Sequence, residues 1–282
     1  MGKFRKIAVI GVGMIGGSIG LAVKKRGMAR EVCGICRREV SAWAARKSGA
    51  VDTVTMDFNV GLKGADLIII AAPVGKIVDI AMKVAEYAGR GAIVTDVGST
   101  KGEIVAAIER AMPRHLKFVG GHPMAGSEKS GVSAADPGIF KNSLCILTKT
   151  ARTDLRALKC VMKFWEGLGA MCPVLSPKLH DRYISFISHL PHVTASGLCA
   201  AVEPASLMYA STGFRDTTRI AASDPDLWSD IFLTNRRAVL SSIKKYMGVI
   251  GKIERTIRNR DRKGLRAILE KAGKTRGRIG LG

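Results

Sequence analysis

The first segment with residues suited to ligand binding contains three closely spaced glycines. Gly11-Val-Gly13-Met14-Ile15-Gly16 follows an apolar run at Ile7–Ile10 and precedes a helical pattern over 18–25. In such a strand–turn–helix context the first glycine permits a tight turn, the second lets a pyrophosphate approach the backbone, and the third lets helix pack on strand. The helix N-terminus would bind the phosphates. We therefore predict a dinucleotide site at Gly11, Gly13, Met14, Ile15 and Gly16, a tight turn without a ligand being the alternative.

A histidine set among glycines and a proline marks the second segment, FVGGHPMAGSEKSG at 118–131. Glycine and proline disfavour helices and strand interiors, so we predict a loop that follows a strand at Lys117–Val119. Histidine has a pKa close to neutral pH, which suits proton transfer. His122 is therefore a candidate catalytic residue, and a hydrogen-bonded loop histidine is the alternative.

The order of the predicted elements shows what positions these segments. In the first half, β-rich runs alternate with helical stretches, which predicts a parallel α/β sheet. From Pro177 onward only helical patterns follow, broken at Pro191, Pro204 and Pro225. We predict a Rossmann NAD(P)-binding domain over 1–173 and an all-α domain over 174–282. The predicted strands are Lys6–Ile10, Glu31–Cys36, Asp66–Ala71, Ala92–Asp96, Lys117–Val119 and Ser143–Leu147.

Composition is typical of a globular enzyme. The chain has 282 residues, of which 47% are hydrophobic and 24% charged, and this length favours about two domains. Its N-terminus passes from a few basic residues into an apolar strand without a signal-peptide pattern. The longest apolar run, Leu67–Val74, is too short to span a bilayer. We expect a cytoplasmic protein without a membrane partner.

Cysteine spacing and net charge raise two further hypotheses. Cys33-Gly-Ile-Cys36 has the spacing of a redox or zinc pair, but it lies in a predicted strand, so we expect two buried cysteines. The formal net charge is +22, and a non-catalytic NADP- or nucleic-acid-binding protein would suit it. Much of this charge lies opposite the apolar side of a predicted helix at Val239–Ile257. Without an aromatic platform or zinc-finger pattern, we expect a solvated face and no nucleic acid.

Six motifs in chain order carry a family resemblance: Asp66–Pro73, Thr95–Lys101, Gly120–Gly126, His180-Asp181, Ser188–His192 and Gly213–Ile220. They closely resemble those of the prephenate and arogenate (cyclohexadienyl) dehydrogenases of tyrosine biosynthesis, and the resemblance covers nearly the whole chain. It implies a helical dimerisation domain, a homodimer, and NAD(P)-dependent oxidative decarboxylation of prephenate to 4-hydroxyphenylpyruvate or of arogenate to tyrosine. A β-hydroxyacid-type dehydrogenase is the alternative, but its lysine within a glycine-rich helix has no counterpart after residue 174.

The resemblance also implies roles for individual residues. His122 would accept the proton of the substrate's ring hydroxyl, and Ser99 would share the contact to that hydroxyl, although Ser99 could also be the N-cap of a helix at Lys101–Arg110. Arg219 would grip a substrate carboxylate, with Arg215 as the other candidate. The remaining assignments are His192 at the far end of the substrate, Ser127 near its keto or amino group, and Pro73 at the cofactor.

Two ligand questions complete the sequence predictions. An NAD-selective Rossmann domain places Asp or Glu at the end of its second strand, but this chain has Cys36 there, followed by Arg37 and Arg38. Guanidinium groups pair well with a 2′-phosphate, so we predict NADP as the preferred cofactor and NAD as the weaker one. His189 and His192 have helical spacing that would suit a metal, but hydride chemistry needs none, and we expect no metal site.

Overall fold

The computed structural model describes residues 3–126 and 130–279, and its contacts divide the chain into two compact units. These are Met1–Arg236 and Arg237–Gly282. All described strands belong to the first unit, and only helices follow β9 (Val174–Leu175). The domain boundary that we predict at residue 174 therefore lies inside the first unit and stays a prediction.

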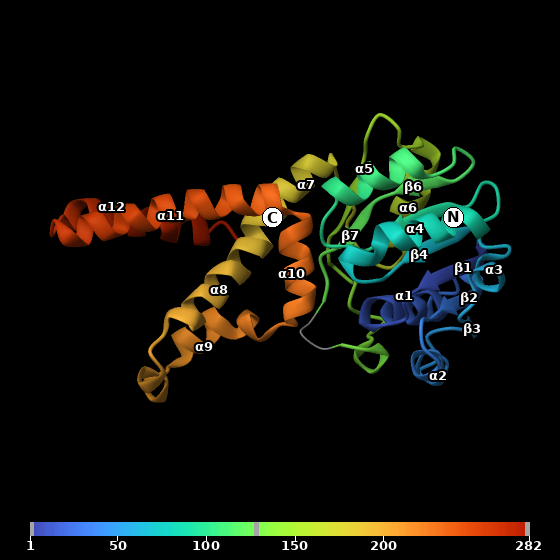
Figure 1. The fold of residues 1–282 in the computed structure, drawn as a ribbon, viewed down its shortest axis with the longest axis horizontal. Coiled ribbons are helices and arrows are strands. Elements are labelled where there is room, and N and C mark those ends of the chain that lie inside the picture. Colours follow the sequence, from blue (N-terminus) through green and yellow to red (C-terminus); the bar gives the residue numbers. More distant parts are fainter. Residues whose placement is uncertain (1–2, 127–129, 280–282) are drawn as a thin grey trace. The chain divides into compact units, whose positions relative to one another are not determined.

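A six-stranded parallel sheet forms the centre of the first unit (Figure 1). The strand order is β3-β2-β1-β4-β5-β6, the order of a Rossmann fold, which confirms the predicted class. Strand β3 was not predicted, because three residues are too few to show a pattern. The strands are β1 (Phe4–Ile10), β2 (Ala29–Ile35), β3 (Thr53–Thr55), β4 (Leu67–Ile70), β5 (Ile93–Asp96) and β6 (Lys117–Val119).

Helices cover both faces of this sheet, because successive strand residues point to opposite sides. Ile7 and Val9 of β1 belong to the hydrophobic cluster that also contains residues of α1 and α6. Ala8 and Ile10 belong to a second cluster, formed with α4 and α5. Buried on both faces, the strands show continuous apolar runs. The helices are α1 (Met14–Lys25), α2 (Glu39–Lys47), α3 (Phe58–Leu62), α4 (Ile77–Tyr87), α5 (Gly102–Ala111) and α6 (Leu155–Gly167).

A second, three-stranded sheet corrects two predictions. His122 lies on strand β7 (Gly121–Pro123) rather than in a loop, and it pairs antiparallel with Ile146 of β8 (Cys145–Thr148). The predicted strand at Ser143–Leu147 thus exists, but outside the parallel sheet, where β8 pairs with β9. The glycines permit close packing here: a Cβ at position 121 would lie 2.9 Å from the carbonyl oxygen of Asp96. This close approach outweighs the low strand propensity of glycine.

Helices make up the rest of the chain. Pro204 and Pro225 each lie in the first turn of a helical segment, as the predicted breaks require. The predicted break at Pro191 is wrong, because the backbone stays helical through His189 and Leu190 into Pro191. A π-helical turn at Ser185–His189 joins α7 to α8. The α-helices are α7 (Pro177–Ile184), α8 (Leu190–Ala201), α9 (Thr212–Thr218), α10 (Pro225–Thr234), α11 (Arg236–Arg258) and α12 (Arg262–Arg276).

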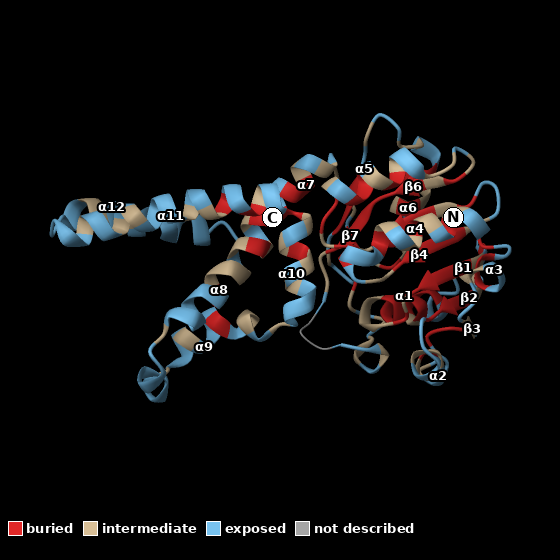
Figure 2. Ribbon diagram, in the orientation of Figure 1, coloured by how far each residue is buried: buried red, intermediate tan, exposed pale blue. Residues whose placement is uncertain are grey.

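Burial differs sharply along the chain (Figure 2). The strands of the parallel sheet are largely buried, whereas the described part of α12 has no buried residue. Cys33 and Cys36 are buried and unpaired with another cysteine, as the strand interpretation predicts. Over the described ranges, no helix combines the length and apolar character needed to cross a membrane.

Candidate active site

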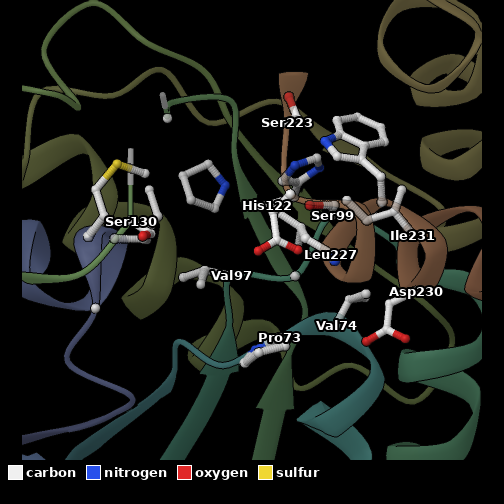
Figure 3. A pocket seen from close by; sticks show the side chains of 18 of the residues that line it. Pro73, Val74, Val97, Ser99, His122, Ser130, Ser223, Leu227, Asp230 and Ile231 are labelled. Atoms are coloured by element: carbon white, nitrogen blue, oxygen red, sulfur yellow. Dashed lines mark hydrogen bonds between the residues drawn. The ribbon is translucent and has the colours of Figure 1, made fainter. Parts of the chain in front are cut away.

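A cavity of about 760 Å³ opens within the first unit, at the carboxyl ends of the parallel strands (Figure 3). This edge is where open α/β sheets bind their ligands. The glycine turn, the segments after β4 and β5, and strand β7 line one side. Helices α8 and α10, with the 3₁₀ turn Arg219–Ala222, line the other. The cavity therefore has a nucleotide side and a helical side.

The glycine turn fits a pyrophosphate. Gly11 has φ +89°, and a Cβ there would lie 2.3 Å from the carbonyl oxygen of Ala71. A Cβ on Gly16 would lie 2.1 Å from the carbonyl oxygen of Gly11, so both glycines are needed for backbone packing. A Cβ on Gly13, in contrast, would meet no atom of the described residues within 4 Å. The open space at Gly13 is where a phosphate can approach the backbone.

The start of α1 gives this site its electrostatic preference. No described side chain caps the N-terminus of α1, and its first turn contains no acidic residue. Backbone N–H groups and the helix dipole at such an end favour an anion. Gly13, Met14, Ile15 and Pro73 line the cavity beside it, so the predicted cofactor residues are brought together.

Arg37 and Arg38 lie just beyond the end of β2. The N–H of Gly11 donates to the carbonyl oxygen of Ile35 at 2.9 Å, so these residues follow a strand that contacts the glycine turn. Both arginines are exposed and neither lines the cavity. Cys36 is buried, and its burial raises the pKa of the thiol.

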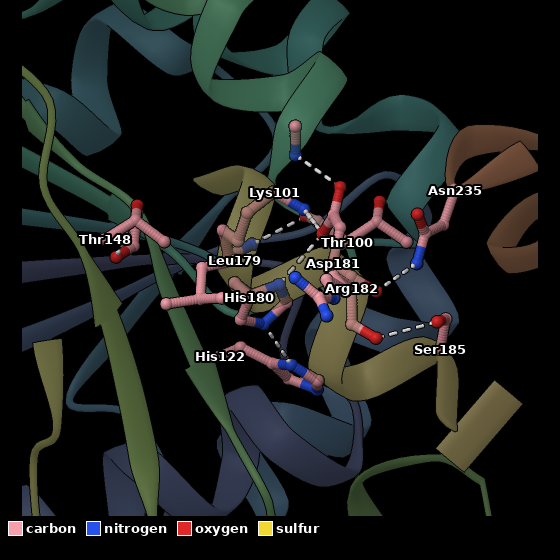
Figure 4. A network of polar contacts seen from close by, with 12 residues as sticks. Thr100, Lys101, His122, Thr148, Leu179, His180, Asp181, Arg182, Ser185 and Asn235 are labelled. Carbon is pink, nitrogen blue, oxygen red and sulfur yellow. Dashed lines mark hydrogen bonds and ion pairs between the residues drawn. The ribbon is translucent and has the colours of Figure 1, made fainter. Parts of the chain in front are cut away.

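His122 is buried at the wall of the cavity and belongs to a chain of hydrogen bonds (Figure 4). Its Nδ1 lies 2.9 Å from Nε2 of His180, whose Nδ1 lies 2.8 Å from Oδ1 of Asp181. Burial, followed by the charges of His180 and Lys101, lowers the pKa of His122 well below its ordinary value. The ring is therefore neutral at neutral pH and can accept a proton.

Asp181 anchors this series of hydrogen bonds to the nucleotide-binding part of the first unit. Its two carboxylate oxygens accept the backbone N–H groups of Lys101 at 2.8 Å and Gly102 at 2.7 Å, so that it caps α5 from a distant part of the sequence. The hypothesis that Ser99 is the N-cap is wrong, because the N-cap of α5 is Lys101. Ser99 instead lines the cavity.

A buried ion pair holds the loop that carries Ser99. Nζ of Lys101 lies 2.6 Å from Oδ2 of Asp96 and donates to the carbonyl oxygens of Gly98 and Thr100 at 2.8 and 2.9 Å. Asp96 and Lys101 are both fully buried, so loss of either would leave an uncompensated charge. Asp96 also accepts the N–H of Gly121 at 3.1 Å, which ties β7 to β5. Sequence reasoning missed this pair, although both residues lie in the Thr95–Lys101 motif.

The helical side presents an aromatic stack and a cation. The ring of His192 stacks on Trp228 with centroids 3.3 Å apart and an interplanar angle of 21°. Burial, and then the charge of Arg219, lowers the pKa of His192 to about 4. Both Arg219 and His192 line the cavity, whereas Arg215 does not. Trp228 was not singled out from the sequence, because a lone tryptophan in a helix gives no local signal.

His189 does not join His192 as a pair of ligands. Its Nδ1 lies 3.1 Å from Nδ2 of Asn235, and its side chain is buried away from the cavity lining. In the part of the chain that the structure describes, no group of three or more His, Cys, Asp or Glu residues could hold a metal ion. Ser127 lies outside the described residues, so its place at the substrate stays a prediction.

Comparison with known proteins gives consistent matches over both parts of the chain. The family model described as prephenate dehydrogenase, nucleotide-binding domain, matches residues 19–174, and the one described as prephenate dehydrogenase, dimerization domain, matches residues 176–271. A prephenate dehydrogenase of Bacillus subtilis (strain 168) is 38% identical over 269 residues, which are 92% of this chain and 72% of that protein.

Two solved structures share the fold of this chain. The structure of prephenate dehydrogenase from Aquifex aeolicus in complex with hydroxyphenyl propionate and NAD+ has a TM-score of 0.92 at 32% identity, over 98% of each chain. Arogenate dehydrogenase of Synechocystis has a TM-score of 0.85 at 30% identity, over 97% of this chain and 99% of that one.

Proposed function

This chain belongs to the prephenate dehydrogenase family, and we propose that it catalyses the NAD(P)-dependent oxidative decarboxylation of prephenate, arogenate or both in tyrosine biosynthesis. The observation that carries the proposal is the buried, neutral His122 at a cavity with a nucleotide turn on one side and Arg219 on the other. Neither a β-hydroxyacid-type dehydrogenase nor a nucleic-acid-binding protein accounts for this combination.

The chemistry assigns His122 the role of general base. The substrate ring carries a hydroxyl on the carbon that loses hydride, and a carboxylate across the ring that leaves as carbon dioxide. A bound nicotinamide supplies the hydride acceptor. His122 takes the hydroxyl proton: the O–H bond breaks as an N–H bond forms on the ring. Ser99, at the wall of the same cavity, contacts the hydroxyl through its own side chain, which can donate and accept.

Charge complementarity supports the proposed substrate contacts. Prephenate and arogenate each carry two carboxylates, and Arg219 offers a planar guanidinium on the helical side of the cavity. His192 is held neutral beside it and offers one donor and one acceptor to the far end of the substrate. Ser127 is proposed near the keto or amino group from the sequence alone.

Cofactor selectivity is proposed from the end of β2. NADP and NAD share the glycine turn and the start of α1, so they differ only at the ribose 2′ position. Arg37 and Arg38 are exposed at the end of β2, where a Rossmann domain contacts the ribose 2′ position. Burial raises the pKa of the Cys36 thiol, so this side chain carries no negative charge that would oppose a phosphate. We infer a preference for NADP, with Arg37 as the main contact.

A homodimer is proposed from the second unit. Its helix α11 exposes large apolar side chains, including Leu240 at 55%, Met247 at 65% and Ile257 at 60%. Such a row of apolar residues is stabilised by a partner surface. Sedimentation is expected to show a dimer at micromolar concentration, and a monomer would contradict this. A cytoplasmic location is proposed from the sequence alone.

The decisive experiment is an initial-rate assay of prephenate and arogenate, each with NADP and NAD. We expect oxidation of at least one substrate with release of carbon dioxide, and a higher kcat/KM with NADP. A 3-hydroxy acid is the control substrate. Turnover of that acid, with neither cyclohexadienyl substrate oxidised, would overturn the proposal.

A further inference from the structure

We propose that His180 is a positioning residue that holds His122 in its Nδ1–H tautomer, so that Nε2 of His122 carries the lone pair that takes the substrate's proton. The inference rests on the proposed function for the role of His122 as base. It adds a residue that contacts neither substrate nor cofactor, since His180 does not line the cavity.

The hydrogen bonds fix each proton in turn. Asp181 accepts two backbone N–H groups and lies at the end of the chain of contacts, so its carboxylate can only accept from Nδ1 of His180. A neutral His180 with its proton on Nδ1 has a lone pair on Nε2. Nδ1 of His122, 2.9 Å away, must then donate to that lone pair. The lone pair of His122 is left on its other nitrogen, Nε2.

Burial keeps His180 in its neutral form, against the effect of the neighbouring carboxylates. The groups that face the two rings are the carboxylates of Asp181 and Asp96, the ammonium of Lys101 and the ring of His189. The ammonium of Lys101 is paired with Asp96. Full burial of His180 outweighs the raising effect of Asp181 and lowers the pKa of its ring. A protonated His180 would donate from Nε2 and reverse the tautomer of His122.

Because Asp181 is held in place, the hydrogen bonds select one tautomer of His122. Asp181 is held by the N-terminus of α5, and its backbone carbonyl accepts from Nδ2 of Asn235 at 3.0 Å. His180 therefore cannot rotate without breaking a buried contact. Without His180, a neutral His122 could carry its proton on either nitrogen, and the Nε2–H form cannot accept the substrate proton.

His180 also affects the protonated state of the base. When Nε2 of His122 gains the substrate proton, the ring becomes an imidazolium whose Nδ1–H still donates to His180. The Asp181 carboxylate at the other end of His180 stabilises this charge through the intervening ring. A histidine oriented by a carboxylate follows the same logic in a Ser-His-Asp triad, where removing the orienting carboxylate produces the wrong tautomer.

The direct test is nitrogen NMR of the chain labelled with ¹⁵N-histidine. The sequence has five histidines, and the His122 signals are those that disappear in His122→Asn. At neutral pH we expect Nδ1 of His122 to be protonated and Nε2 to be unprotonated. The opposite tautomer in the native protein would overturn the proposal. This measurement needs no substrate, so it distinguishes failure of the tautomer proposal from failure of the proposed function.

Two substitutions at His180 separate positioning from packing. Asparagine can still donate to Asp181 from near the Nδ1 position but offers no acceptor to His122, whereas glutamine can place its amide oxygen near the Nε2 position. We expect His180→Asn to lower kcat by about 10- to 100-fold, with KM changed by less than about threefold. His180→Gln should recover part of that loss.

The control is His115→Asn, the same substitution at a half-buried site outside the network, and it should leave kcat unchanged. A folded His180→Asn protein with native kcat and the native His122 tautomer would overturn the proposal. Thermal melting checks the fold of each variant. If His180→Asn does not fold, the tautomer in the spectrum of the native protein decides the question.

Discussion

The two sides of the cavity differ in whether backbone or side chains form the contacts that fit a ligand. On the nucleotide side, the contacts that fit a ligand come from backbone: the glycine turn and the start of α1 lie within six consecutive residues. On the helical side, and at the wall between the two sides, the contacts that fit a ligand come from side chains of separate elements. His192 stacks on Trp228, and His180 is hydrogen-bonded to His122. A backbone site is encoded locally, whereas a side-chain site exists only after folding.

The comparison predicts different consequences for mutation on the two sides. Substitutions in the glycine turn should affect the approach of the cofactor or the packing of backbone against backbone. Substitutions among the side chains should affect turnover or substrate affinity and leave the cofactor bound. A glycine-turn variant that lowers only substrate affinity, or a side-chain variant that lowers only cofactor affinity, would contradict this division.

The largest expected effect is that of His122→Asn. Loss of a general base costs about 10² to 10⁴ in kcat, because the imidazole is the proton acceptor of the proposed reaction. The dissociation constant of the cofactor should change little, since the imidazole is not part of the glycine turn. Steady-state kinetics with cofactor titration measures both quantities. A variant with near-native kcat would remove His122 from the chemistry.

Next in size is the effect of Arg219→Ala on substrate affinity. A charge-assisted contact made in the ground state contributes about 1.5 to 3 kcal/mol, so we expect KM to rise by about 10- to 100-fold while kcat holds. Arg215→Ala is the matched control: it lies four residues earlier, does not line the cavity, and should leave KM nearly unchanged. A fall in kcat with constant KM would show that Arg219 acts in the transition state instead.

The same contrast explains how much could be predicted from the sequence. The glycine turn, five of the six parallel strands and the helical second half all follow from local spacing, because each pattern is complete within about ten residues. His122 and Arg219 were recognised from family motifs. The sequence could not show that Ser99 is not the cap of α5. The side chain that caps this helix belongs to Asp181, which accepts the N–H of Lys101 from 80 residues away in the sequence.

The misassigned strands have an equally physical cause. Position 122 was predicted as a loop from its glycines, yet Gly121 allows β7 to approach β5 closely, since a Cβ there would lie 2.9 Å from the carbonyl oxygen of Asp96. Trp228 and Asn235 gave no signal, since their importance lies in contacts with His192 and Asp181 that no local pattern encodes.

Cofactor selectivity tests the comparison from the nucleotide side. Cys36→Asp combined with Arg37→Ile introduces a carboxylate for the 2′-hydroxyl and removes a partner for the 2′-phosphate. We expect the ratio of kcat/KM values for NADP and NAD to shift toward NAD by about 10- to 100-fold. The KM for the cyclohexadienyl substrate should stay constant. Equal kcat/KM for the two cofactors in the native enzyme would refute the selectivity argument.

The two glycines of the turn should respond differently to one methyl group. Gly13→Ala adds a Cβ that meets no atom of the described residues within 4 Å, so the fold should keep its stability while cofactor affinity falls by about tenfold. Gly11→Ala is the counterpart, because its Cβ would lie 2.3 Å from a carbonyl oxygen at φ +89°. It should lower Tm instead. Cofactor titration and thermal melting distinguish the outcomes, and a lower Tm for Gly13→Ala would contradict the assigned open space.

The smallest expected effect is a pH dependence of stability that originates on the helical side. Burial lowers the pKa of His189 from 6.5 to about 4, so between these values the unfolded chain binds more protons than the folded one. The free energy of unfolding must then fall as pH is lowered from about 6.5 toward 4. Over the first pH unit of this range, from about 6.5 to 5.5, the contribution of His189 to the fall is on the order of 1 kcal/mol, or a few degrees in Tm. His189→Asn keeps an acceptor for Asn235 and removes the titrating group, so melting curves of this variant should depend less on pH than those of the native protein. Identical pH profiles would show that His189 is protonated equally in the folded and unfolded states.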